Sequence, residues 1–98
     1  MTTNGMAIGE DLQRILWACL AYWSNEPLAF DERVICYSWV ARLHQNKFGV
    51  SFAPSKLRYL GELGLLAQVD TSRGGDRRYW RINDPQLVAK ILHGCNFN

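Results

Sequence analysis

The chain has no long hydrophobic run. A membrane span requires roughly 20 apolar residues, whereas the longest candidate, Ile15 to Trp23, is shorter and follows charged residues. The first residues also lack a basic leader with a cleavage site. Both absences predict a cytoplasmic protein with no membrane partner.

Cysteine pairs are missing as well. Cys19, Cys36 and Cys95 lie far apart in the sequence and show no CxxC spacing. This pattern argues against a disulfide framework and against a zinc site. Cys19 and Cys36 fall on predicted apolar helix faces, where a free thiol behaves as a small hydrophobic group. We therefore expect core cysteines in a reducing compartment, and no metal.

The motifs of the common enzyme classes are absent. The sequence contains no nucleophilic serine motif, no phosphate-binding glycine loop and no paired carboxylates. Neither His44 nor His93 has a cysteine and an acid at a recognisable spacing, and His44, beside a predicted turn, is interpreted as a helix-end or phosphate contact. The prediction is a protein that is not an enzyme and that has no cofactor.

The apolar residues that are present suffice for one domain. The chain has 98 residues, of which 48% are hydrophobic, and a chain of this size buries a single core. Residues 1–9 are small and polar and carry no Arg or Lys, which predicts a flexible N-terminal arm. Residues 10–98 are predicted to form the domain.

Apolar spacing predicts two helices in the first half of the domain. The first runs from Glu10 to about Asn25 and is apolar on two sides. One side is expected to face the core, and the other to meet the last helix or another subunit. The second runs from about Glu32 to Gln45, and Asp31 is expected to cap it.

The third predicted helix is short and bounded by glycines. Gly49 lies in the preceding turn, where it can adopt a positive φ angle. The helix begins at Ser51 or Ala53 and carries Pro54 in its first turn, where the missing N–H costs nothing. Gly64 ends it. Its inward-facing residues are predicted to be Leu57, Leu60 and Leu63.

A β-hairpin and a fourth helix complete the chain. Leu66 to Asp70 and Arg77 to Ile82 alternate in the manner of strands, and Thr71 to Asp76 has the composition of a hairpin turn. Asn83 or Asp84 is expected to cap the last helix. The predicted fold is therefore α+β and mostly α-helical, with a three-helix core, a two-stranded hairpin and a C-terminal helix.

Basic residues gather in the second half of the chain. Between Arg42 and Arg81 there are eight basic and three acidic residues, a net charge of +5, whereas the remaining residues carry a net charge of −3. A basic patch on one part of a domain is typical of a nucleic-acid-binding protein.

Two segments carry a resemblance to a known family. Residues 49–66, GVSFAPSKLRYLGELGLL, resemble the second half of the helix-turn-helix of small bacterial winged-helix regulators of the ArsR and MarR type. Residues 73–82, RGGDRRYWRI, are similar to the wing and returning strand of these regulators. The resemblance covers about residues 32–82 and implies a winged helix-turn-helix with its third helix in the DNA major groove and an arginine of the wing in the minor groove.

The chain also departs from both families. It lacks the paired-cysteine motif of metal-sensing ArsR proteins and the long flanking helices of MarR subunits. Metal sensing is therefore not expected. The chain is expected to be a compact or divergent member of these regulator families.

The predicted DNA-binding residues lie at the leading end of the third helix and at the hairpin tip. Lys56 can donate to guanine or phosphate, Tyr59 can donate to phosphate, and Phe52 can touch a thymine methyl group. Crowded arginines at the tip would be stabilised by phosphate or by a narrow minor groove. A merely solvated helix face remains an open alternative for Lys56 and Arg58. The full set is Ser51, Phe52, Ser55, Lys56, Arg58, Tyr59, Arg73, Arg77 and Arg78.

Two functions are compatible with these patterns. The first is sequence-specific binding of double-stranded DNA by a homodimeric transcriptional regulator, which would select palindromic sites. The second is a winged-helix protein-interaction module in a replication, recombination or mobile-element assembly, with a protein partner on the first or last helix. It is favoured by the aromatic residues of the helices, which are typical of interfaces: Trp17, Tyr22, Trp23 and Trp39. A small-ligand sensor has no motif behind it.

Overall fold

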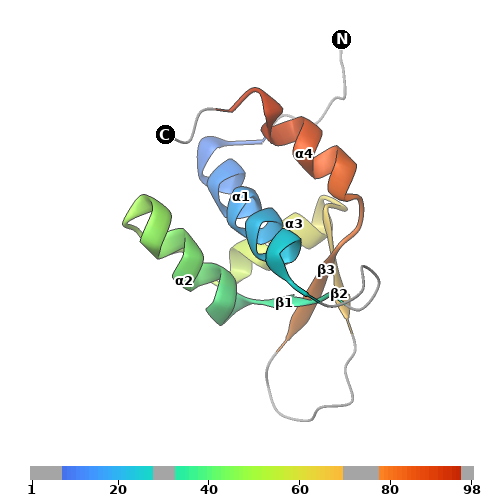
Figure 1. The fold of residues 1–98 in the computed structure, drawn as a ribbon, viewed down its shortest axis with the longest axis horizontal. Coiled ribbons are helices and arrows are strands. Elements are labelled where there is room, and N and C mark those ends of the chain that lie inside the picture. Colours follow the sequence, from blue (N-terminus) through green and yellow to red (C-terminus); the bar gives the residue numbers. More distant parts are fainter. Residues whose placement is uncertain (1–7, 28–32, 70–77, 96–98) are drawn as a thin grey trace.

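The fold is α+β and mostly helical. The computed structural model describes residues 8–27, 33–69 and 78–95. Within these ranges four helices pack together with a small antiparallel sheet at one end of them (Figure 1). In chain order the elements are α1 (Glu10–Asn25), β1 (Ile35–Cys36), α2 (Tyr37–Phe48), α3 (Ser55–Glu62), β2 (Leu66–Val69), β3 (Tyr79–Ile82) and α4 (Pro85–His93).

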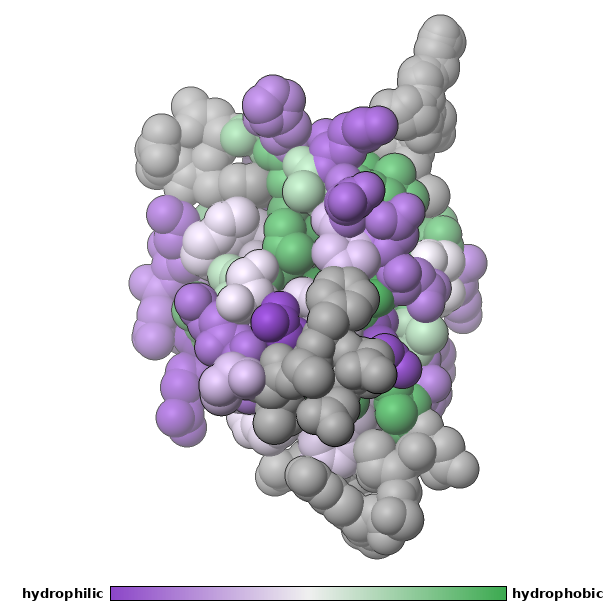
Figure 2. Space-filling view, turned by 45° about the vertical axis from the view of Figure 1, so that its right-hand side comes forward, coloured by the Kyte–Doolittle hydropathy of each residue, from purple (hydrophilic) through white to green (hydrophobic). Residues whose placement is uncertain are grey.

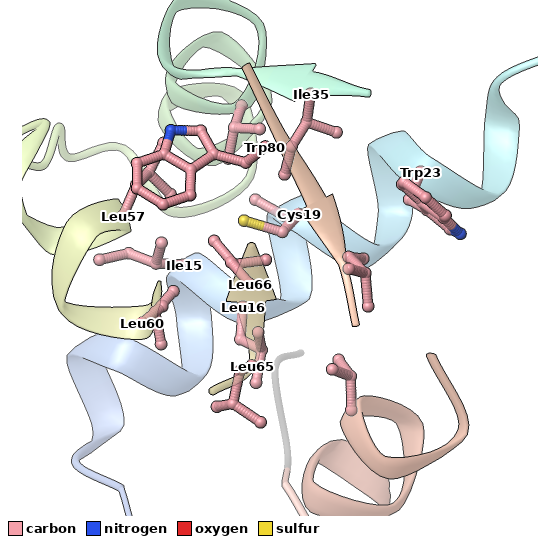
Figure 3. Close-up of a cluster of buried hydrophobic side chains, with 14 of the residues drawn as sticks. Ile15, Leu16, Cys19, Trp23, Ile35, Leu57, Leu60, Leu65, Leu66 and Trp80 are labelled. Atoms are coloured by element: carbon pink, nitrogen blue, oxygen red, sulfur yellow. The ribbon is translucent and has the colours of Figure 1, made fainter. Parts of the chain in front are cut away.

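Helix α1 runs through the middle of the molecule. It packs against both α2 and α4, and it also contacts β1 and β3. Figure 3 shows Ile15, Leu16 and Cys19 of α1 gathered with the leucines of α3 and β2, and all three side chains are buried. The predicted bounds of this helix are confirmed.

The second apolar side of α1 is largely used within the chain. The ring of Trp17 lies 5.6 Å from the ring of Phe48 in an edge-on contact, and Tyr22 stacks on Trp39 at 5.3 Å. Val50 and Tyr59 are the exposed large hydrophobic residues in the described part of the chain. On the face shown in Figure 2, apolar residues form narrow patches between hydrophilic ones. The described residues of this face therefore form no broad apolar surface.

Strand β3 is the centre of the sheet. It pairs antiparallel with β2 on one side and with β1 on the other, giving the order β1-β3-β2. Trp80 lies opposite Ile35 in one pair and opposite Gln68 in the other. The two predicted strands of the hairpin are confirmed with slightly shorter bounds, while the predicted turn, Thr71 to Asp76, lies outside the described residues.

The predicted start of the second helix is wrong. Ile35 and Cys36 form strand β1 instead of the first turn of a helix, and α2 begins at Tyr37 and continues to Phe48. Ile35 and Cys36 are buried, and their backbone groups pair with β3, which stabilises the extended form. Cys36 consequently lies on a strand and not on a helix face. The predicted cap, Asp31, lies outside the described residues.

Helix α3 is shorter than predicted. It begins at Ser55 and not at Ser51 or Ala53, and Pro54 immediately precedes it. Leu57 and Leu60 are buried. The predicted stop is confirmed: Gly64 has a φ angle of +84°, which favours glycine because it has no Cβ. The predicted positive φ angle of Gly49, +77°, is confirmed as well.

A hydrogen-bonded junction joins the end of α3 to the start of α4. The side-chain amide of Asn83 donates to the carbonyl of Gly64 at 2.8 Å, and its backbone N–H donates to Leu65 at 3.2 Å. Asp84, one of the two residues predicted to cap α4, does so: its side chain accepts a hydrogen bond from the backbone N–H of Leu87.

None of the helices in the described ranges has the length and apolar character needed to cross a membrane.

Candidate nucleic-acid interface

Helix α3 presents its polar residues on one face because its leucines fix the other. Leu57 and Leu60 are buried against the core, one helical turn apart. Ser55, Arg58 and Tyr59 are therefore exposed, and Tyr59 retains 47% of its accessible surface. These three predicted site residues share the outward side of the helix.

Arg78 stands at the base of the hairpin, next to the first residue of β3. Together with Arg58 it lines a cavity of about 530 Å³ between the start of α2, helix α3 and β3. The hydroxyl-bearing residues Ser38 and Ser55 line the same cavity, and none of the described residues that line it is acidic. Within the described ranges neither arginine forms an ion pair. The structure thus brings Ser55, Arg58 and Arg78 together.

Lys56 is engaged elsewhere. Its ammonium group lies 3.4 Å from a carboxylate oxygen of Asp11 on α1, and its side chain is 44% exposed. Such a pair between partly exposed groups contributes ~1 kcal/mol or less, so phosphate can compete for the lysine. Lys56 nevertheless faces α1 more than the outward side of α3, which makes Arg58 the better exposed cation of this helix.

Phe52 is held by neighbours within the chain. Its ring makes edge-on contacts with Tyr37 at 5.2 Å and with His44 at 5.0 Å, and its carbonyl accepts a hydrogen bond from the Tyr37 hydroxyl. The ring is partly buried, so a thymine contact would have to use its remaining edge. Ser51, one residue earlier, is exposed.

His44 is a core residue that contacts the segment after the end of α2, which is one of its two predicted roles, while its burial argues against the other, a phosphate contact. Only 3% of it is exposed, and its Nδ1 lies 2.8 Å from the carbonyl oxygen of Val50. Because a carbonyl only accepts, Nδ1 carries the proton. His44 therefore holds the turn between α2 and α3 and has no surface for a ligand.

Two predicted site residues cannot be placed, and one contributor was missed. Arg73 and Arg77 lie outside the described residues. Ser38, at the start of α2, was not predicted, because the second helix was expected to start earlier and to place this residue away from its end. The position of Ser38 depends on β1, which has only two residues, Ile35 and Cys36. Two residues are too few to show the alternating pattern by which a strand is recognised.

The cysteines have the environment of core residues. Cys19 is fully buried, and burial raises the pKa of its thiol to about 12, because the thiolate is desolvated there. Cys36 is buried and Cys95 partly so, and all three are free. No group of three or more potential metal ligands occurs in the described ranges.

Comparison with protein-family models, with curated proteins and with solved structures finds no match to this chain. The site is therefore interpreted from its own geometry.

Proposed function

We propose that this protein is a winged helix-turn-helix that binds double-stranded DNA, in the cytoplasm and as a homodimeric transcriptional regulator. The element order supports a winged helix: α1, β1, α2 and α3 are followed by the β2–β3 hairpin. The short strand β1 joins this hairpin to the helical core. In this proposal β2 and β3 form the stem of the wing.

The observation that carries the proposal is that Arg58 and Arg78 line one cavity, in which none of the described lining residues is acidic. Two guanidinium groups at one place repel each other unless an anion lies near, and guanidinium forms bidentate hydrogen bonds with phosphate. One arginine belongs to α3 and the other to the hairpin base. A DNA backbone that passes between the two elements would satisfy both groups.

The exposed face of α3 would then enter the major groove. An α-helix fits that groove, and residues near its N-terminus reach the base edges. Ser55 begins the helix and Tyr59 follows one turn later on the same side. In this arrangement Ser55 is the residue closest to the bases, while Arg58, Tyr59 and Arg78 bind the backbone.

Selection of bound sequences from a random duplex pool tests this function. A palindromic consensus is expected, because a two-fold dimer binds two related half-sites. If four to six phosphates are contacted, log K should fall with log salt at a slope of about −4 to −5. An absence of duplex binding at low salt, or an affinity that does not change with salt, would contradict the proposal.

The alternative function, a protein-interaction module, rests on one surface feature. Tyr22, Trp39 and Tyr79 form a series of aromatic contacts across α1, α2 and β3, and Tyr22 and Trp39 remain partly exposed. Aromatic residues of this kind are enriched at interfaces. Light scattering, which gives the oligomeric state, and the duplex-binding experiment together separate the two proposals. A monomer that does not bind DNA favours the interaction module, and a dimer that binds DNA favours the regulator.

A further inference from the structure

The cavity between α2, α3 and β3 has the dimensions of a small-molecule site. Its volume of about 530 Å³ falls within the range of roughly 300–1,000 Å³ that is usual for ligand pockets. It is formed by residues from three different elements, and buried side chains hold its base. A DNA backbone lying across the rim would leave this deeper part unfilled.

The walls of the cavity divide into an apolar base and a cationic rim. Cys36, Leu57 and Trp80 form the base and are buried, and Figure 3 shows the indole of Trp80 beside Leu57. Arg58 and Arg78 occupy the rim and are exposed. The matching ligand therefore has a flat apolar body and an anionic head.

The number of cations indicates the charge of that head. Among the described residues, two guanidinium groups and no carboxylate line the cavity, so a dianion balances them better than a monoanion does. A phosphomonoester carries about −1.5 to −2 charges at neutral pH and three strong acceptor oxygens. Those oxygens can accept bidentate hydrogen bonds from guanidinium. The hydroxyls of Ser38 and Ser55 supply two further donors at the same cavity.

We propose that this cavity binds a small organic phosphomonoester. The phosphate lies between Arg58 and Arg78, and a flat apolar body rests against Trp80 and Leu57. Aryl phosphates and nucleoside monophosphates share this chemistry, and so does the terminal 5′-phosphate of a DNA strand. If the proposed function holds, ligand and DNA compete, because both require the same two arginines.

Binding of 1-naphthyl phosphate to the full chain tests the site without any DNA. The readout is the indole N–H signal of Trp80 in a proton–nitrogen correlation spectrum, assigned with Trp80→Phe. We expect this signal to shift on titration. 1-Naphthyl sulfate, which is a monoanion, should bind at least about tenfold more weakly, the factor expected for one charged hydrogen bond. Inorganic phosphate, which lacks the apolar body, should also bind more weakly because it buries no apolar surface. Equal affinity for all three probes, or an unmoved Trp80 signal, would overturn the proposal.

Substitutions at the rim separate this site from general surface binding. Arg58→Gln and Arg78→Gln should each weaken 1-naphthyl phosphate roughly tenfold, since each removes a charged donor. Arg42→Gln is the matched control, because Arg42 is an exposed arginine of α2 that does not line the cavity. Ser38→Trp should fill the entrance and abolish binding. Unchanged affinity in the two rim variants and in Ser38→Trp would contradict the assignment, provided that the thermal unfolding midpoints confirm folded protein.

The pH dependence gives an independent check on the charge of the head. The second pKa of a phosphomonoester is about 6, so binding of 1-naphthyl phosphate should weaken as the pH falls from about 7.5 to 5.5. The sulfate keeps one charge throughout this range, and its weaker binding should remain constant. Parallel pH curves for the two probes would contradict recognition of a dianion.

The last comparison identifies the source of the phosphate and keeps the two proposals apart. Thymidine monophosphate and blunt duplexes with or without 5′-phosphates are titrated in the same way. Tighter binding of the phosphorylated duplex assigns the cavity to DNA ends, and binding of the free nucleotide alone assigns it to a small ligand. Duplex binding without any response to 1-naphthyl phosphate overturns only the cavity proposal. The opposite result overturns only the proposed DNA-binding function.

Discussion

Gly61 of α3 lies directly against the indole of Trp80. A Cβ atom built on Gly61 would meet Cζ3 of Trp80 at 2.9 Å, closer than such carbons approach in practice. The absence of a side chain at this position lets α3 approach the ring of Trp80 closely. Since Trp80 and Leu57 also form the base of the cavity, the same contact sets the distance between α3 and the hairpin.

Substitution of this glycine is expected to destabilise the fold. Gly61→Ala would gain up to about 1 kcal/mol of helix propensity, but overpacking against a buried ring costs about 1–3 kcal/mol. We expect a net loss in the free energy of unfolding, measured by urea denaturation. Glu62→Ala, at the exposed neighbouring position, is the control and should change little. The double variant Gly61→Ala/Trp80→Phe should show less loss than the two single losses added, and a more stable Gly61→Ala protein would contradict the contact.

Loss of the rim arginines should weaken DNA binding without selecting among sequences. Arg58→Gln and Arg78→Gln each remove one proposed phosphate contact, so the slope of log K against log salt should decrease by about 1 for each variant. Fluorescence anisotropy with a labelled duplex measures this slope, and Arg42→Gln serves again as the control. An unchanged slope in both rim variants would place the DNA elsewhere on the molecule.

The ion pair between Lys56 and Asp11 should restrain DNA binding slightly. Asp11→Asn frees the lysine and is expected to raise the DNA affinity by up to about fivefold, which corresponds to the ~1 kcal/mol of a partly exposed pair. Glu10→Gln is the matched control, since Glu10 pairs with Arg14 on the same helix at 3.0 Å. Equal effects of the two variants would mean that the lost negative charge acts at long range and that the pair itself has no role.

The thiol of Cys19 should be unreactive while the protein is folded. Burial raises its pKa to about 12 from the ordinary thiol value of 9.0, so the folded state holds its proton at pH values where the unfolded state has lost it. Stability should therefore fall as the pH rises from 9.0 toward about 12. Labelling with a thiol reagent at neutral pH should modify Cys95 first and Cys19 only after denaturant is added. Rapid modification of Cys19 in the native protein would contradict its burial.

The elements that could be predicted are those determined by residues close together in the chain. The apolar spacing and acidic first turn of α1 predicted its full length. Gly64 and Asp84 marked the end of α3 and the start of α4, because a positive φ angle and a side-chain cap depend on one or two residues. The leucines of α3 predicted which of its side chains face outward, and Ser55 and Tyr59 are exposed as expected. Lys56 was expected on the same side but is only partly exposed, and Arg58, expected at the flank, is fully exposed.

The remaining features depend on contacts between distant residues. The spacing of Ile35 and Cys36 relative to Trp39 and Val40 fits a helix, yet pairing with β3 makes the first two extended. Phe52 was predicted to be exposed at the leading end of the third helix, but its ring packs on that of the buried His44. The cavity could not be predicted either, since three elements meet to form it.

Strand β1 also bears on how the chain reaches this structure. The hairpin of β2 and β3 joins neighbouring segments and can form early, whereas Ile35 can meet Trp80 only after α2, α3 and β2 have been brought together. Closing so long a loop costs entropy that the pairing recovers late. Ile35→Val should accordingly speed unfolding more than it slows refolding. The pairing of β1 with β3 therefore slows the unfolding of the assembled domain.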